Sequence, residues 1–498
     1  MQVMSSHWMP FALYGLNRFI TQGSNRALAG GTAALVMQNW SCGYYLLYFA
    51  PFVPMFVIFR MWTARKLTNL RVWLPLAAAA VVTIALTLPF LLPYLDAQQR
   101  FGFVRGYHEV VSFAADVWSY ITAPESIRLW GRTLRFFPHN EGETFLGFVP
   151  WIVAIVGLAL SGPFLPHRDQ PRSLGYKIGV GLLLLIVISQ IVAVVAAVVF
   201  GGLDVSLWGI VLRARTPRRL MLQCVLFILL LAAVSKDFRF AGRNLARSPL
   251  VFFLVMTVLA MWFSLGPEVR TGGVYVSGIG LYNVLYDYVP GFSGVRVPAR
   301  FAMIAALFLA GAAGCALAIV MRRWRTAGFV VAGLAGVCAV ADSAPMPLLV
   351  NQAWVERETM PPSRVFTAAG APAVYQHVKA LPAGSAITEF PFGDAGWEIR
   401  YVYYSAVHWK PVVNGYSGAF PPAYKVRQAR FQDVTRDPEA AWKALVDSKS
   451  THVVFHEKAF RNVDMAAAVK SWLESHGATV IETTADGDIL YELKSSGG

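Results

Sequence analysis

The chain has 498 residues, of which 56% are hydrophobic and 14% charged, and its formal net charge is +15. This composition excludes an ordinary soluble protein, in which about a quarter of the residues carry charge. Basicity alone would suit a nucleic-acid-binding protein, but the positions of the charges along the chain argue against nucleic acid as a partner.

Ten apolar segments alternate with polar stretches along the first 345 residues. They cover residues 6–17, 27–42, 44–59, 72–95, 146–162, 178–200, 220–234, 249–265, 301–320 and 327–343. Several approach the roughly 20 residues that a helix needs to cross a bilayer, and the shorter ones need a thinner bilayer or a half-span. The sequence therefore predicts a polytopic α-helical membrane protein with about ten membrane segments.

Cations gather in every second loop between these segments. If the first segment runs inward, the inner loops hold sixteen cations and only two acids, Asp169 and Asp237. Basic loops stay in the cytosol, so the bias predicts that the remaining loops and the C-terminal region lie outside. The sixteen cations are Arg18, Arg26, Arg60, Arg65, Lys66, Arg71, Arg168, Arg172, Lys177, Lys236, Arg239, Arg243, Arg247, Arg322, Arg323 and Arg325.

Three predicted outer loops cover residues 96–144, 201–219 and 268–299. The first is too long for a simple connector, so we expect it to be structured, with residues 109–120 forming a helix along the membrane surface. In the second, residues 203–208 and 210–213 are typical of a β-hairpin. Proline at positions 89 and 93 should kink or end the preceding membrane helix.

Residues 289–301, V-P-G-F-S-G-V-R-V-P-A-R-F, form a rigid turn directly before the ninth apolar segment. Its two arginines, Arg296 and Arg300, would lie at the depth where a lipid phosphate is met. Each arginine taken singly fits simple anchoring at the membrane interface better than a phosphate site, and the pair with its rigid turn makes a stronger phosphate-site candidate than either arginine alone. A second candidate phosphate grip, with the same alternative, is formed by the four arginines of the 201–219 loop: Arg213 and Arg215, with Arg218 and Arg219.

From about residue 346 the sequence predicts a compact α/β domain that reaches residue 498. Expected strands are residues 386–390, 401–404, 452–456, 479–482 and 489–493, and expected helices are residues 371–380, 438–447 and 464–476. A cluster of aromatic and amide side chains suits binding of a glycan, although a domain core and packing face explain it equally well. The glycan-binding candidates are Trp397, Tyr404, His408, Trp409, Asn414 and Tyr416.

The membrane segments contain almost no ionisable residue in mid-span, which weighs against an ion-coupled transporter. Phosphate-binding loops, dinucleotide fingerprints and zinc-protease motifs are missing from the sequence. The polar chemistry is therefore expected in the predicted outer loops. The outer carboxylates available as a general base are Glu109, Asp116, Glu143 and Asp287, and the residues alone do not choose among them.

Six short stretches resemble bacterial multi-pass membrane proteins related to the GT-C glycosyltransferases, including the YfhO-like group. They are residues 5–10 (SSHWMP), 39–45 (NWSCGYY), 142–147 (GETFLG), 264–267 (SLGP), 289–301 and 413–419 (VNGYSGA). The resemblance implies a membrane bundle with an extracytoplasmic α/β domain in the bacterial inner membrane, and an enzyme that uses a polyprenyl-phosphate-linked sugar. It also implies a catalytic carboxylate in a first outer loop that precedes this chain, so we expect a longer upstream reading frame.

These considerations leave two hypotheses. The first is a GT-C-like glycosyltransferase, or its C-terminal portion, that modifies a cell-envelope glycan or lipid. Its cofactor stays open, and a divalent metal ion is one group that could offset the phosphate charge. The alternative is a non-catalytic envelope protein that binds lipid-linked glycan or assists its assembly. A transporter fits the sequence least well.

Overall fold

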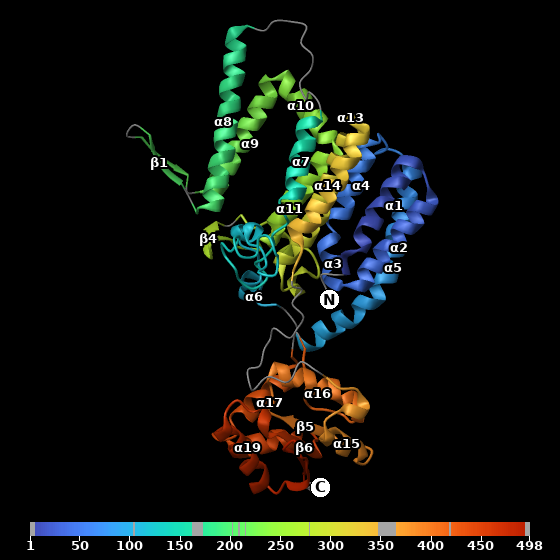
Figure 1. Ribbon diagram of the computed structural model, residues 1–498, viewed down its shortest axis with the longest axis vertical. Helices are drawn as coiled ribbons and strands as arrows, with labels where there is room; N and C mark the ends of the chain where they lie inside the picture. Colours follow the sequence, from blue (N-terminus) through green and yellow to red (C-terminus); the bar gives the residue numbers. More distant parts are fainter. Residues whose placement is uncertain are drawn as a thin grey trace. The chain divides into compact units, whose positions relative to one another are not determined.

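The computed structural model describes residues 5–102, 105–161, 173–201, 203–207, 210–214, 216–277, 279–346, 365–417 and 420–493. The chain forms two compact units, residues 1–348 and 349–498, close to the predicted boundary after residue 345. The first unit is helical with two small hairpins, and the second contains a four-stranded sheet (Figure 1).

Each predicted apolar segment of the first unit overlaps a helix. These helices are α1 (Trp8–Gln22), α2 (Asn25–Ser41), α3 (Gly43–Phe49), α4 (Phe52–Thr63), α5 (Leu70–Phe101), α7 (Val149–Leu160), α8 (Leu174–Val199), α9 (Pro217–Val234), α11 (Pro249–Ser264), α13 (Phe301–Arg323) and α14 (Arg325–Ser343). Short elements join them: α6 (Tyr107–Ser112), η2 (Val117–Ile121), β1 (Leu203–Leu207), β2 (Ile210–Ala214), α10 (Lys236–Arg247), β3 (Val269–Thr271), β4 (Val274–Ser277), α12 (Tyr282–Tyr288), η3 (Phe292–Gly294) and η4 (Pro298–Arg300).

Six helices in the described part of the chain are long and apolar enough to cross a membrane, and a seventh is obtained if α10 and α11, bent by 80°, count as one span. The six are Gly43–Thr63, α5, α8, α9, Pro298–Arg323 and α14. The predicted number of ten spans is not shown, because α1, α2 and α7 have only 15, 17 and 12 residues, below the roughly 20 that a span needs.

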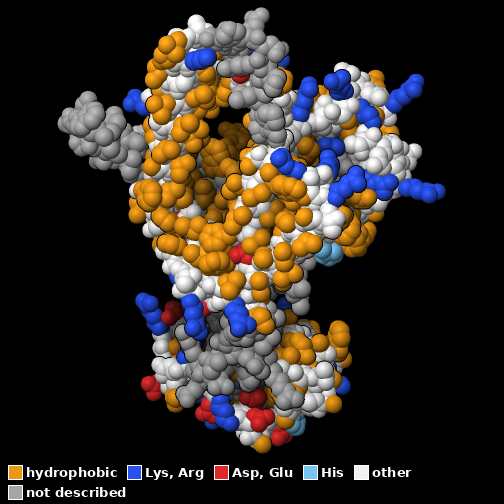
Figure 2. Space-filling model, turned by 45° about the horizontal axis from the view of Figure 1, so that its top comes forward, with side chains coloured by type: hydrophobic (Ala, Val, Ile, Leu, Met, Phe, Trp, Pro, Cys, Tyr) orange, Lys and Arg blue, Asp and Glu red, His pale blue; other side chains and the backbone are white. Residues whose placement is uncertain are grey.

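Successive long helices run in opposite directions, so the described parts of the predicted inner loops lie together at one end of this unit (Figure 1). Figure 2 shows Lys and Arg side chains around that end and a broad apolar surface along the flank. We refer to the opposite end, with α6, α12 and the start of α13, as the loop end. The basic side chains at the end opposite the loop end agree with the charge pattern of a membrane protein.

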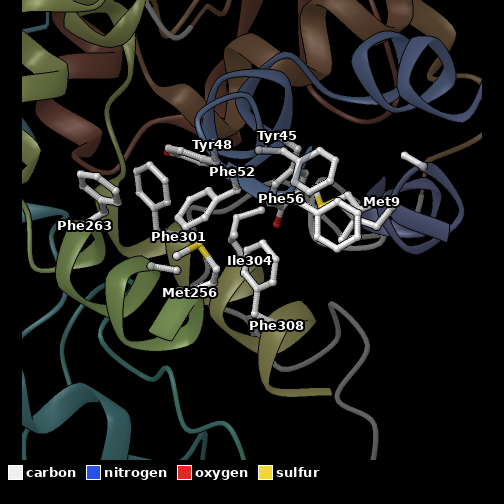
Figure 3. Close-up of a cluster of buried hydrophobic side chains, with 14 of the residues drawn as sticks. Met9, Tyr45, Tyr48, Phe52, Phe56, Met256, Phe263, Phe301, Ile304 and Phe308 are labelled. Carbon is white, nitrogen blue, oxygen red and sulfur yellow. The ribbon is translucent and has the colours of Figure 1, made fainter. Parts of the chain in front are cut away.

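Aromatic side chains form the core at the loop-end half of the bundle (Figure 3). Phe301, the first residue of α13, lies 4.6 Å from the Tyr48 ring and 5.2 Å from the Phe263 ring, measured between centroids. Elsewhere small residues let helices approach: a Cβ added at Gly15 of α1 would lie 2.5 Å from the Ala27 carbonyl oxygen of α2. Membrane helices often pack through such small residues.

Two local predictions for this unit need correction. Helix α5 continues through Pro89 and Pro93 to Phe101, so these prolines do not end it. Neighbouring helices and local adjustment make proline tolerable in membrane helices. The expected helix over residues 109–120 is split into α6 and η2, because Asp116 takes an extended conformation and caps η2. The predicted hairpin is confirmed as β1–β2.

The second unit has the strand order β5-β6-β8-β7, with β5 (Ile387–Phe390) parallel to β6 (His452–His456) and the other pairs antiparallel. Strands β7 (Thr479–Thr483) and β8 (Asp488–Glu492) complete the sheet. The helices are η6 (Ala368–Gly370), α15 (Ala373–Ala380), α16 (Ala395–His408), α17 (Pro422–Gln432), α18 (Pro438–Asp447), η7 (Glu457–Ala459) and α19 (Val463–Ser475). Four of five predicted strands and all three predicted helices are confirmed within a few residues, but the predicted strand 401–404 is wrong because it lies in α16.

Candidate functional site

The loop before α13 is fixed to three other segments at the loop end. The backbone N–H of Ala299 donates to the Phe113 carbonyl at 3.3 Å, and the N–H of Arg105 donates to the Ser293 carbonyl at 3.3 Å. The buried Tyr48 hydroxyl donates to the Val297 carbonyl at 2.6 Å. The loop is therefore held before the first of the two predicted phosphate-binding arginines and between them.

Arg300 forms a two-pronged ion pair with Glu141. Its Nη2 lies 2.6 Å from Oε1 and its Nε lies 3.3 Å from Oε2 of the same carboxylate. The guanidinium also lies over the Tyr44 ring, 5.5 Å from its centroid. Glu141 has φ +61°, a left-handed conformation that a residue with a side chain rarely adopts. The ion pair thus holds a strained turn against the start of α13, and the sequence analysis did not select Glu141.

Arg296 is held much more loosely. Its Nε lies 3.9 Å from Glu109 Oε1, too far for a hydrogen bond, and is buried without a hydrogen-bond partner among the described residues. The guanidinium lies over the Phe113 ring, 4.8 Å from the centroid. Glu109 also lies 3.4 Å from Arg105 Nη1. One carboxylate therefore faces two guanidinium groups, which leaves a local excess of positive charge.

The other predicted carboxylates differ in whether they already form hydrogen bonds or ion pairs within the protein. Asp116 is 3% exposed and accepts hydrogen bonds from the backbone N–H groups of Trp118, Gly272 and Gly273 at 2.9–3.0 Å. It therefore ties η2 to the β3–β4 turn. Glu143 forms an ion pair with Arg135.

Asp287, in contrast, is exposed on α12. Of the four predicted carboxylates, only Glu109 lies within ion-pair distance of a predicted phosphate-binding arginine. Of the second candidate grip, only Arg218 and Arg219 are described, as exposed residues in the first turn of α9, because the Arg213 side chain and the whole of Arg215 lie outside the described residues.

Tyrosines cluster beside the Arg300–Glu141 pair. The Tyr44 and Tyr48 rings stack with centroids 6.2 Å apart, and Tyr45 meets the edge of Tyr48 at the same distance. Tyr282 of α12 lies 6.1 Å from Phe292 and 6.3 Å from Phe301. The motif at residues 39–45 and the loop at 289–301, far apart in sequence, are thus brought together at one place.

The predicted glycan-binding residues in the second unit do not share one surface. Tyr404, His408 and Asn414 are buried, and Trp397 is half-buried. Trp409 and Tyr416 are exposed, at 84% and 52%. Asn414 bonds the backbone of Glu389 through both its amide atoms, at 2.6 Å and 2.9 Å, which is a structural role. Only the half-buried and exposed aromatic residues could touch a glycan without rearrangement.

A buried polar chain lies at the ends of β5, β6 and β8. His456 Nε2 lies 3.0 Å from Glu389 Oε2, and His456 Nδ1 lies 2.9 Å from Asp488 Oδ1. The Tyr375 hydroxyl donates to Glu389 Oε2 at 2.8 Å. Burial by itself lowers the pKa of His456, but the two carboxylates bond to the ring and raise it to about 9. The protonated His456 ring thus offsets negative charge of Glu389 and Asp488 inside the domain.

Metal binding receives no support from the described ranges, in which no group of three or more His, Cys, Asp or Glu side chains is arranged to hold an ion. Comparison of the sequence with protein-family models and with curated proteins found no match. The resemblance to GT-C glycosyltransferases therefore stays a prediction.

Proposed function

We propose that the protein is a GT-C-like membrane glycosyltransferase, or the C-terminal portion of one, that takes its sugar from a polyprenyl-phosphate carrier and modifies a cell-envelope glycan or lipid. In this proposal the loop end and the second unit face the outside of the bacterial inner membrane. The observation that supports it is Arg296, a guanidinium at the end of an apolar bundle whose Nε has no hydrogen-bond acceptor in the described part of the chain.

Arg296 suits a lipid phosphate because a guanidinium binds phosphate oxygens through several parallel N–H donors. Arg300 has a different task in this proposal. Its two-pronged bond to Glu141 positions the loop, and its positive charge adds to the field at the phosphate. In this proposal Glu109, 3.9 Å from Arg296, accepts a proton from an acceptor hydroxyl near the sugar.

Binding can be tested with the full-length protein in nanodiscs and undecaprenyl phosphate as the ligand. We expect Arg296→Gln to weaken binding by at least about tenfold, because a hydrogen bond to a charged group contributes about 1.5–3 kcal/mol. Arg100→Gln is the matched control, since Arg100 is exposed at the loop-end terminus of α5 and its ion-pair partner in the described part of the chain is Asp96. Equal affinity of wild type and Arg296→Gln would refute the phosphate site.

A non-catalytic protein that binds lipid-linked glycan is the second candidate. It is favoured because two of the predicted general bases already have partners within the protein. Asp116 accepts from backbone N–H groups, and Glu143 is paired with Arg135. Transfer of labelled sugar from a polyprenyl-phosphate donor to envelope acceptors separates the two functions. The enzyme predicts transfer that Glu109→Gln abolishes while lipid binding persists, whereas the binder predicts lipid binding without transfer in the wild type.

A further inference from the structure

Helix α10 carries a run of basic residues between two apolar helices, α9 and α11. Its single acidic residue, Asp237, is 7% exposed and so does little to offset the cations at the surface. Charged side chains are costly in the hydrocarbon core of a membrane, so α10 belongs outside it. The cations of this 12-residue helix are Lys236, Arg239, Arg243 and Arg247.

The bend between α10 and α11 sets the direction of α10 relative to the bundle. The two helices are bent by 80° at Ser248. If α11 crosses a membrane, a helix nearly perpendicular to it runs along the bilayer surface, at the level of the lipid headgroups. The other end of α10 is fixed to α9, because Arg239 Nη1 donates to the Ala232 carbonyl and, at 2.7 Å, to the Ala233 carbonyl. Figure 1 shows α10 at the end of the unit away from the loop end.

Three exposed cations share one face of α10. Lys236, Arg243 and Arg247 are separated by seven and four residues, a spacing that places them on the same side of a helix. Within the described part of the chain none of the three forms an ion pair. The Arg247 guanidinium lies over the Trp62 ring of α4, 6.0 Å from its centroid, which leaves its charge in place. The face is therefore positive and is not neutralised by the described residues.

The opposite face of α10 is apolar and packs against the bundle. Phe238, Ala241 and Leu245 recur at helical spacing and are partly buried, and α10 contacts both α9 and α11. Phe240, in contrast, lies among the cations and is 44% exposed. Cations together with an exposed aromatic ring are typical of helices that bind the interface of an anionic membrane.

We propose that the cationic face of α10, formed by Lys236, Phe240, Arg243 and Arg247, binds the headgroups of anionic phospholipids. The ammonium and guanidinium groups bind the lipid phosphate, and the Phe240 ring enters the boundary between headgroups and acyl chains. Negative lipids attract basic segments beside a membrane helix over about one Debye length. A zwitterionic lipid carries a cation of its own and is attracted less. This site lies opposite the loop end and does not depend on sugar transfer.

Native mass spectrometry of the full-length protein in detergent can compare dioleoyl phosphatidylglycerol with dioleoyl phosphatidylcholine as the first bound lipid. Wild type should bind phosphatidylglycerol more tightly. Lys236→Gln/Arg243→Gln should weaken that binding roughly 10–30-fold, because each basic residue near an anionic surface contributes about a factor of five. Affinity for phosphatidylcholine should not change. Raising ammonium acetate from about 0.1 M to about 1 M should reduce the preference, since the Debye length falls from about 10 Å to about 3 Å.

Arg26→Gln/Arg325→Gln is the matched control, because it removes the same charge from exposed residues at the same end of the unit but outside α10. It should keep the preference for phosphatidylglycerol. Lys236→Arg/Arg243→Lys keeps the charge of α10 and should bind as wild type does, and all three variants should melt at the wild-type temperature.

The proposal is overturned if wild type binds the two lipids equally, or if the glutamine variant of α10 binds phosphatidylglycerol no more weakly than the matched control does. A polyglutamate peptide added to the protein in phosphatidylcholine nanodiscs tests the other kind of anionic partner. Binding of this peptide that depends on the α10 cations, without a preference for phosphatidylglycerol, would assign the face to an acidic protein and would also overturn the proposal.

Discussion

The buried His456 makes the stability of the second unit depend on pH in a direction that the geometry fixes. The ring lies between Glu389, which is 0% exposed, and Asp488, and it stacks on Tyr401 with centroids 5.2 Å apart. Burial disfavours the imidazolium, but the two carboxylates outweigh burial and raise the pKa of His456 from 6.5 to about 9. Folding therefore favours the protonated ring.

This shift in pKa corresponds to about 3 kcal/mol, at about 1.4 kcal/mol for each pH unit. Because the pKa is higher in the folded state, the stabilisation is fully present below pH 6.5 and is lost as the pH rises through 9. His452, on the same strand, behaves oppositely. Burial lowers its pKa, so its influence on the free energy of unfolding is confined to pH values below 6.5. His456→Gln should abolish the decline between pH 6.5 and 9, and His452→Gln should keep it.

Pulse proteolysis of the full-length protein in urea measures this effect, with peptides from residues 365–493 quantified by mass spectrometry between pH 6 and 9.5. Wild type should lose roughly 3 kcal/mol of unfolding free energy across the window. The reasoning is refuted if wild type shows no loss between pH 6.5 and 9, or if His456→Gln declines as steeply as wild type.

Two further predictions concern the first unit. Asp116→Asn should destabilise the first unit by about 1–3 kcal/mol, because an amide NH₂ would face backbone N–H donors that the carboxylate now satisfies. Unchanged thermal stability with lost sugar transfer would instead make Asp116 catalytic. Gly15→Ala should lower the melting temperature by crowding α1 against α2, at about 1–3 kcal/mol, whereas Gly30→Ala should not, since a Cβ there has nothing within 4 Å. Equal melting temperatures for these two variants would contradict the packing argument.

Local features of the sequence predicted elements well where one signal dominated. Strands β5, β6, β7 and β8 follow from short apolar runs bounded by turns. Residues 401–404 were misassigned because Tyr-Val-Tyr-Tyr favours a strand, whereas Asp394 caps a helix by accepting from the Gly396 and Trp397 N–H groups. Buried Glu398, Tyr401, Tyr404 and His408 then recur at helical spacing.

The candidate site depended on contacts that local patterns do not encode. The Arg300–Glu141 pair joins residues 159 positions apart, and sequence spacing gives no reason to prefer Glu141 over Glu143, two residues later. The cluster of buried tyrosines likewise needs α3 and α12 to meet, which follows only from the packing of the bundle. Sequence reasoning could name the arginines, but it could not say what each one touches.

These contacts separate two arginines that look equivalent in the sequence. Removing Arg300 would leave Glu141 without its cation and release the strained turn at φ +61°, so a loss of lipid binding in that variant would report folding as much as recognition. Among the described residues Arg296 makes no comparable bond, and its replacement therefore tests recognition with little effect on the loop. A double substitution would mix the effect on folding with the effect on recognition. The single substitution of Arg296 is therefore the one that tests binding of a lipid phosphate.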